Sequence, residues 1–298
     1  MVMGVNVRIP EFREDAAEVE VAVGDPERLA AFIDSCRSLL VMSGAGCSTG
    51  SGIPAYRDGA GRWQRNNPIQ YQAFVTRAAA RRRYWARSYL GWPRMRLAEP
   101  NPAHLALAQL EAGGRLSRLV TQNVDGLHQR AGSRLVTELH GSLAEVVCLD
   151  CGTRLDRDLF QEQLRASNPH WEARVHGINP DGDAELEADA WEDFCTVPCP
   201  ECGGILKPDV VFFGESVPGE RVCQVRRCLE ESDGVLVVGS SLVVWSGYRF
   251  VREAAAAGIP VVAVNQGRTR ADALLNFKLP QACDTALEQT TRLLAAGS

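Results

Sequence analysis

Two pairs of cysteines constrain this chain most strongly. Cys148-x-x-Cys151 and Cys199-x-x-Cys202 share one spacing and lie on either side of a long polar segment. Each pair presents two thiolates to one ion, and two such pairs complete a tetrahedral zinc site with no open position. We therefore predict one structural Zn²⁺ rather than a catalytic metal. Two redox-active pairs are the weaker alternative.

Composition places the chain among ordinary globular proteins. It has 298 residues, of which 45% are hydrophobic and 23% charged, enough for one large domain and a smaller one. The net charge of -5 argues against nucleic-acid or anionic-membrane partners. No apolar run is long enough to span a bilayer, and acidic residues 1–25 resemble neither a signal nor a transit peptide. We expect a cytoplasmic protein.

Apolar runs alternate with helical patterns. Polar caps, prolines and glycines mark the ends of these segments. We expect helices at residues 25–36, 71–89, 101–113 and 248–257, and strands at 38–42, 116–120, 210–213, 234–239 and 259–264. Strands that are nearly all apolar indicate a parallel sheet covered on both faces. The arginine-rich helix 71–89 is expected to be peripheral, and the polar residues 152–198 to be an insertion.

Small polar residues follow several predicted strands. Gly44-Ala45-Gly46 lets a backbone approach a phosphate, and a following helix start would supply N–H donors, although the spacing is not G-x-G-x-x-G. A plain turn is an equal alternative here. Residues 122–125, 239–241 and 265–267 also follow strands. Together they favour an extended ligand across the carboxyl edge of the sheet.

A single histidine precedes the first cysteine pair. His140, before Gly141, is either a hydrogen-bonded residue beside the core or one held between two modules. In the second position it could act as a general base near neutral pH.

In order, these segments resemble the sirtuin family of NAD-dependent protein deacylases. The residues that carry the resemblance are 44–48, 52–57, 121–125, 139–141, both cysteine pairs, 207–215, 239–241 and 265–267. The resemblance covers about residues 28 to 295. Tyr84-Trp85-Ala86-Arg87, residues 91–93, the insertion with residues 180–183, and residues 246–250 are most similar to class II sirtuins.

The resemblance implies roles at the matching positions. The backbone of residues 44–48 would hold the pyrophosphate of NAD, Arg57 would help to order the cofactor, and Gln122 would contact the nicotinamide ribose. Asn123 and Asp125 would line the nicotinamide pocket, with His140 and Asn123 as catalytic residues. The implied cofactor-binding residues are Gly44, Ala45, Gly46, Ser48, Ile53, Pro54, Tyr56, Arg57, Gln122, Asn123, Val124, Asp125, Gly239, Ser240, Ser241, Asn265, Gln266, Gly267 and Cys283.

The resemblance also implies the reaction. Loss of nicotinamide from NAD leaves an electrophilic ribose that the acyl oxygen of lysine captures, and His140 removes a proton from a ribose hydroxyl. Acyl transfer then yields O-acyl-ADP-ribose. The acyl-lysine peptide would pair as a strand with residues 210–213 and 239–242.

Two residues depart from the family pattern, and one pair of residues extends it. Ala55 replaces a usual acidic or polar residue, and Cys47 replaces an aliphatic one, either as packing or as a thiol open to modification. Tyr84-x-x-Arg87 resembles a pair that binds acidic acyl groups in another sirtuin class, although a coincidence on a helix surface is an equal alternative. If Arg87 faces the pocket, acidic acyl groups should be preferred.

We therefore expect an α/β fold: a Rossmann-like parallel sheet with helices on both faces, plus a small inserted zinc-binding domain. The large domain is predicted to span residues 1–143 and 204–298, with a helical insertion at about 60–100, and the zinc module residues 144–203. The expected partner is an acyl-lysine protein or peptide, without nucleic acid or membrane, and the expected state is a monomer. Alternatives are a mono-ADP-ribosyltransferase, a nicotinamide dehydrogenase and a non-catalytic zinc-stabilised binding module.

Overall fold

The structure is a computed structural model that describes residues 20–58, 62, 68–187 and 189–296. The acidic segment up to residue 19 lies outside these residues. So does the start of the predicted helical insertion, at residues 60, 61 and 63–67. Among the described residues, every helix is too short or too polar to cross a membrane.

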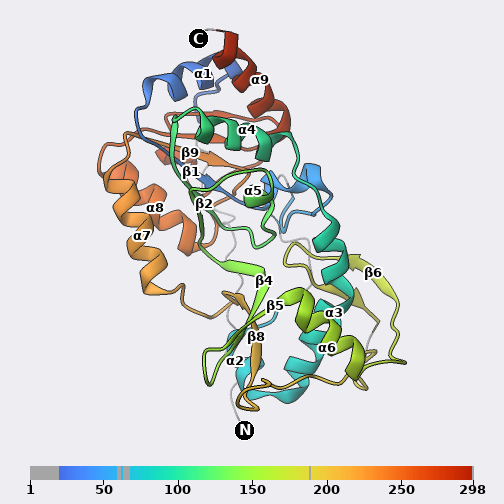
Figure 1. Ribbon diagram of the computed structural model, residues 1–298. Helices are drawn as coiled ribbons and strands as arrows, with labels where there is room; N and C mark the ends of the chain where they lie inside the picture. Colours follow the sequence, from blue (N-terminus) through green and yellow to red (C-terminus); the bar gives the residue numbers. More distant parts are fainter. Residues whose placement is uncertain (1–19, 59–61, 63–67, 188, 297–298) are drawn as a thin grey trace.

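A parallel sheet forms the larger lobe, in the upper part of Figure 1, and its six strands run in the order β11-β10-β9-β1-β2-β3. Their bounds are β1 (Leu39–Ser43), β2 (Leu116–Thr121), β3 (Val136–Glu138), β9 (Gly234–Val238), β10 (Val261–Val264) and β11 (Phe277–Leu279). The chain leaves β1 toward β2 on one side and returns as β9 on the other. Such a change of direction opens a crevice at the carboxyl ends of the strands.

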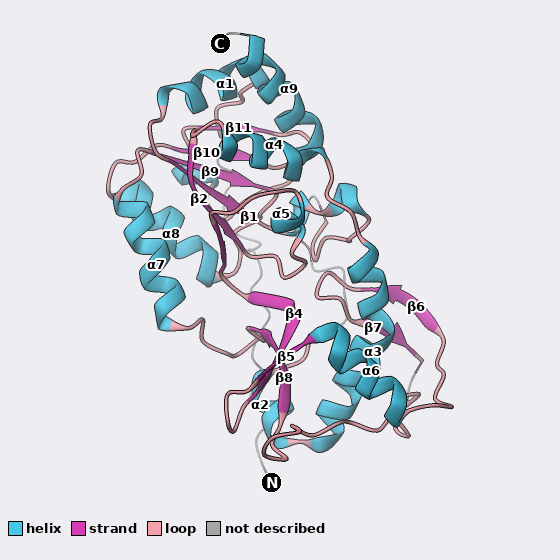
Figure 2. Ribbon diagram, viewed as in Figure 1, coloured by secondary structure: helices cyan, strands magenta, loops and turns pink. Residues whose placement is uncertain are grey.

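Helices cover both faces of this sheet because side chains alternate along each buried strand. Leu39 and Val41 pack on one side, while Leu40 and Met42 pack on the other. The first face is covered by α1 (Pro26–Ser35), α4 (Pro102–Ala112) and α9 (Cys283–Ala296), and the second by α7 (Gly219–Glu230) and α8 (Trp245–Ala256) (Figures 1 and 2). The predicted Rossmann-like sheet is confirmed.

The smaller lobe is built around an antiparallel sheet in the order β5-β4-β8. Its strands are β4 (Gly141–Cys148), β5 (Arg154–Asp156) and β8 (Leu206–Val210), and β6 (Val175–Ile178) pairs with β7 (Ala184–Leu186) beside it. Its helices are α2 (Tyr71–Thr76), α3 (Ala78–Leu97) and α6 (Arg157–Ser167), while α5 (Leu127–Arg130) follows β2. The exact domain boundaries at residues 143/144 and 203/204 stay a prediction.

Two expectations about this lobe are wrong. Residues 210–213 are not a strand of the parallel sheet: β8 ends at Val210 and pairs with β4, and a loop follows. This segment is apolar because Val210 and Phe212 pack into the core of the small lobe. The segment 71–89 is not peripheral either, since Trp85 is 1% exposed and stacks edge-on against Phe160. Aromatic residues on α3 therefore hold the small lobe together.

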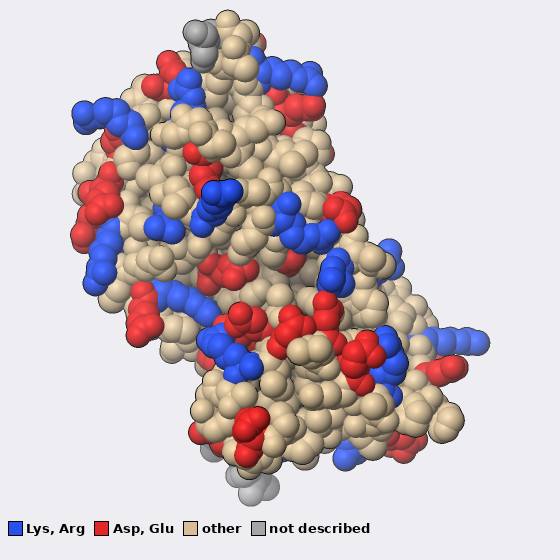
Figure 3. Space-filling model, viewed as in Figure 1, with Lys and Arg blue, Asp and Glu red and all other residues tan. Residues whose placement is uncertain are grey.

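Both charge signs are interspersed over the larger lobe on the face shown in Figure 3. Acidic side chains gather where the two lobes meet on that face. The surface charge on this side is therefore mixed over the larger lobe and locally negative at the junction of the lobes.

Candidate active site

The glycine turn after β1 is attached directly to the end of β9. The Gly44 N–H donates to the Val238 carbonyl at 3.0 Å, and the Gly46 N–H donates to the Gly239 carbonyl at 2.8 Å. Gly239 has a φ of 61°, and a Cβ there would lie 2.2 Å from the Cys47 nitrogen. Only glycine allows this approach of two backbones.

The chain after this glycine turn does not form the helix start that we expected. Two short 3-10 turns follow, at Ala45–Cys47 and Thr49–Ser51, instead of the start of an α-helix. The second ends at Gly52, whose φ is 79° and whose left-handed conformation stops a helix.

A cavity of about 650 Å³ opens at this carboxyl edge and extends between the lobes. Its volume is in the range of small-molecule and cofactor sites. The expected residues that line it are Gly44, Ala45, Gly46, Ser48, Ile53, Tyr56, Arg57, Gln122, Asn123, Val124, Asp125, His140, Gly239, Ser240, Ser241, Asn265, Gln266, Gly267 and Cys283. Among the described residues, Pro54 is the one expected cofactor-binding residue absent from its wall. A dinucleotide therefore fits the walls, which combine backbone and small polar groups.

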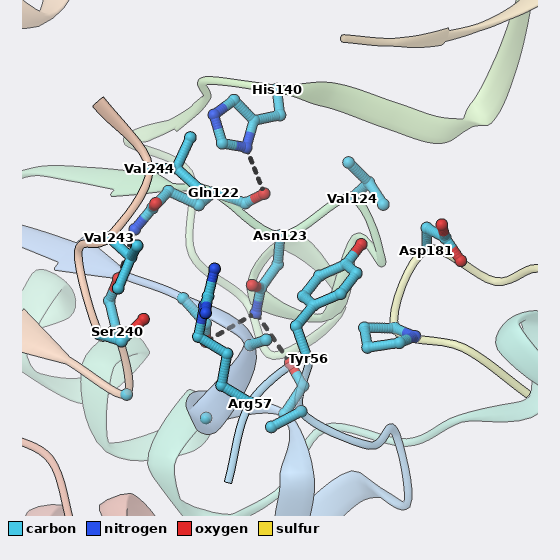
Figure 4. A pocket seen from close by; sticks show the side chains of 18 of the residues that line it. Tyr56, Arg57, Gln122, Asn123, Val124, His140, Asp181, Ser240, Val243 and Val244 are labelled. Atoms are coloured by element: carbon cyan, nitrogen blue, oxygen red, sulfur yellow. Dashed lines mark hydrogen bonds between the residues drawn. The ribbon is translucent and has the colours of Figure 1, made fainter. Parts of the chain in front are cut away.

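His140 lies on the link between β3 and β4, and so between the lobes (Figure 4). Its Nδ1 is 3.0 Å from the Gln122 carbonyl, and its Nε2 is 2.7 Å from Ser246 Oγ. Because a carbonyl can only accept, Nδ1 carries the proton and Nε2 presents its lone pair. Gly141 is required next to it, since a Cβ there would lie 1.8 Å from the Asp209 carbonyl oxygen.

The surroundings of His140 favour its neutral form. Burial lowers the pKa of His140 to about 4, and Arg221 and Arg249 act in the same direction, while the hydrogen bond to the Gln122 carbonyl opposes them. The ring is therefore uncharged at neutral pH. This pKa is well below the usual histidine value of about 6.5.

A hydrogen-bond network joins the end of β2 to the glycine turn. Asn123 Nδ2 donates to the Gly44 carbonyl at 3.1 Å and to Ser48 Oγ at 3.0 Å. Ser48 Oγ donates to Asp125 Oδ2 at 2.7 Å. Burial raises the pKa of Asp125, although the Leu127 N–H and Ser48 hydrogen bonds oppose that shift. Asn123 is thereby fixed in orientation at the floor of the cavity (Figure 4).

The four cysteines of the two pairs converge in the small lobe. Cys148 Sγ is 3.5 Å from Cys202 Sγ, and Cys151 Sγ is 3.7 Å from Cys199 Sγ. All four sulfur atoms lie within 4.8 Å of one another. Zinc–sulfur bonds of about 2.3 Å in a tetrahedron place sulfurs about 3.8 Å apart. The cluster therefore fits the predicted structural Zn²⁺.

The structure shows where the residues that depart from the family pattern or extend it lie. Cys47 is 1% exposed, and burial raises its pKa well above the usual value, so it acts as packing and not as an open thiol. Ala55 lines the cavity. Arg87 does not: its Nε donates to the Ala184 carbonyl at 2.9 Å, and it pairs with Asp183 at 3.8 Å. The condition for preferring acidic acyl groups is not met.

Sequence reasoning missed part of the cavity wall. The insertion contributes Pro180 and Asp181, and the start of α8 contributes Trp245, Ser246 and Arg249. Figure 4 shows Asp181 beside Tyr56, across the cavity from Val243 and Val244. All of them except Trp245 lie in segments that carry the resemblance to class II sirtuins, but no periodicity or spacing marks them as cavity residues, because tertiary packing places these segments.

Comparison with known proteins agrees with this geometry. The model of the Sir2 family matches residues 44–246. An NAD-dependent protein deacetylase of Bordetella bronchiseptica is 53% identical over 90% of this chain and 97% of its own length. The NAD-dependent protein lipoamidase sirtuin-4, mitochondrial, of Bos taurus is 48% identical over 88% of this chain and 85% of its own. A solved structure described as Sir2-p53 peptide-NAD+ superposes with a TM-score of 0.71 at 27% identity, covering 92% of this chain and 99% of that one.

Both the length of the match and the identity of these relatives are decisive: the chain belongs to the Sir2 family, the sirtuins.

Proposed function

We propose that His140 is the general base of this NAD-dependent protein deacylase. The chain is a sirtuin-type enzyme that removes acyl groups from lysine side chains, with NAD as co-substrate and nicotinamide and O-acyl-ADP-ribose as products. The observation that supports the role of His140 is the direction of its lone pair. Nε2 accepts from Ser246 Oγ at 2.7 Å, and both residues line the cavity, while Nδ1–H is held by the Gln122 carbonyl.

Different residues of the cavity would bind different parts of NAD. The turn at residues 44–48 would hold the pyrophosphate, and residues 239–241 and 265–267 with Cys283 the adenosine half. Asn123 and Asp125 would contact the nicotinamide half, where Asn123 is already oriented by two hydrogen bonds. Bound NAD supplies an electrophilic ribose carbon and a ribose hydroxyl. His140 Nε2 would accept the proton of that hydroxyl in place of its hydrogen bond with Ser246 Oγ.

The substrate would be a protein segment that carries an acylated lysine. Residues 210–213 and 239–242 both line the cavity, so an extended peptide would lie between them with its acyl-lysine directed at His140. We propose that the enzyme acts as a monomer in the cytoplasm and without a nucleic-acid partner.

The test compares the wild type with His140→Ala and with a matched control, His170→Ala, at an exposed histidine of the insertion. We expect His140→Ala to lose deacylation of an acetyl-lysine peptide by at least about a hundredfold while it keeps its fold and zinc, since general-base catalysis contributes about 10²–10⁴-fold. The control should match the wild type. Wild-type activity in His140→Ala would remove the proposed role. Label transferred from NAD to protein, without O-acyl-ADP-ribose, would favour the ADP-ribosyltransferase instead.

A further inference from the structure

A tryptophan stands exposed at the mouth of the cavity. Trp245 is the first residue of α8, lines the cavity, and is 45% exposed. Its neighbours Val243 and Val244 are directed toward the cavity in Figure 4. Large aromatic side chains exposed at a binding site are typical contact residues for peptides.

Guanidinium groups surround this tryptophan. Arg252 Cζ lies 4.7 Å from the centre of the Trp245 ring, and Arg270 Cζ lies 5.7 Å from it and 4.3 Å from that of Tyr248. Arg249, one turn along α8, lines the cavity itself. We define these residues, Trp245, Arg249, Arg252 and Arg270, as the cationic rim.

Acidic neighbours act on the charge of the cationic rim only from a distance within the part of the chain that the structure describes, as Glu253 does on Arg249. There, Arg249, Arg252 and Arg270 form no ion pair with a carboxylate. The nearby Glu253 is engaged by Arg226 at 2.9 Å, and Asp272 by Lys278 at 3.1 Å.

Arg249 also carries a buried nitrogen, Nη2, without a hydrogen-bond partner among the described residues. A buried cationic nitrogen without a partner is costly unless a ligand supplies an acceptor. Its side chain lies in the cavity wall, so the acceptor would come from a bound molecule.

We propose that the cationic rim binds carboxylates of acidic residues that flank the acylated lysine, so that the enzyme prefers acidic peptide segments. This inference rests on the proposed function, because it needs a peptide beside Val243 and Val244. An acetylated lysine is neutral, so in an acetylated segment the flanking residues carry the charge. Guanidinium groups bind carboxylates through paired hydrogen bonds. The net charge of -5 means that this basic surface is a local feature.

Arg270 connects the rim to the peptide path. Its Nη1 donates to the Val243 carbonyl at 3.0 Å and thereby fixes the backbone next to which the peptide would lie. Arg252 has no such role, because it is exposed and its guanidinium lies over the Trp245 ring. Arg252→Gln therefore removes charge with little effect on the fold.

The experiment uses acetyl-lysine peptides of one length whose flanking residues are acidic, neutral or basic, assayed with NAD for nicotinamide release. Because the acyl group is always acetyl, charge varies only in the flanks. We expect KM to be roughly fivefold to tenfold lower for the acidic than for the basic peptide, with similar kcat, and the difference to shrink at high salt. Arg252→Gln should raise KM about twofold to fivefold for the acidic peptide alone.

Arg94→Gln, at an exposed arginine of α3 away from the rim, is the matched control and should match the wild type. Equal KM values for acidic and basic peptides would overturn the proposal. So would a Trp245→Ala variant that changes the elution volume of the enzyme while KM stays constant, because the rim would then be a contact between copies of the chain. If no acetyl-lysine peptide releases nicotinamide, the proposed function itself fails, and this outcome is distinct from equal turnover of all peptides.

Discussion

The low pKa of His140 predicts that the enzyme stays active at an unusually low pH. The imidazole loses solvation in the cavity wall and faces two arginines, which together lower its pKa to about 4 from the usual 6.5. A base must be unprotonated to act. At pH 5.5 a group with a pKa of about 4 is about 3% protonated, whereas one with a pKa of about 6.5 is about 90% protonated. The enzyme should therefore keep almost all of its kcat/KM at pH 5.5, instead of about a tenth.

The assay measures kcat/KM for formation of the deacetylated peptide at intervals between pH 4.5 and 8, because this product forms only after the step in which His140 acts and the ratio reports the ionisation of the free enzyme. Circular dichroism and zinc content at each pH verify that the fold persists. Arg249→Gln should move the acid midpoint upward, since it removes a positive charge that opposes protonation of His140. A wild-type midpoint near 6.5 would refute the reasoning, as would a midpoint that Arg249→Gln moves downward.

Three further predictions concern the scaffold. Burial lowers the pKa of His128 to about 3, so that at mildly acidic pH the unfolded state binds a proton that the folded state excludes. The stability of the folded protein is therefore not reduced by this residue above about pH 6.5, and it is lost progressively as the pH falls toward 3. Between pH 8 and pH 5, the free energy of unfolding measured with urea should fall by about 2 kcal/mol less in His128→Asn than in the wild type. An equal fall in both proteins would contradict this. Cys199→Ser should abolish binding of one zinc ion per chain, measured by metal analysis, and unfold the small lobe with loss of activity; an active, zinc-free protein would contradict it. Gly239→Ala should cost about 1–3 kcal/mol of stability and weaken NAD binding in calorimetry, whereas the matched Gly219→Ala, which meets no atom within 4 Å, should do neither.

The large sheet could be read from the sequence because its strands are buried on both faces and therefore nearly all apolar. β1, β2, β9 and β10 each appear within a few residues of their predicted positions. β3 and β11, with three residues each, were too short to give a pattern. The zinc cluster was predictable for a different reason, because the spacing of ligands along the chain is itself the signal.

The loops of the site were less predictable. The apolar residues 210–213 looked like another strand of the parallel sheet, but Val210 and Phe212 pack into the core of the small lobe. Ser246 and Asp181 reach the cavity through contacts between segments distant in sequence, which no local pattern records. The tautomer of His140 also depends on the Gln122 carbonyl, and a carbonyl has no signature in a sequence.

The position of His140 on the strand connection has a mechanical consequence. The residue is followed at once by β4, which belongs to the small lobe, while its ring is tethered to Gln122 at the end of β2 in the large one. A swing of one lobe against the other would thus twist the imidazole away from its carbonyl anchor. The activity of the enzyme therefore depends on the alignment of its two lobes. When the lobes move apart, the general base also loses its orientation.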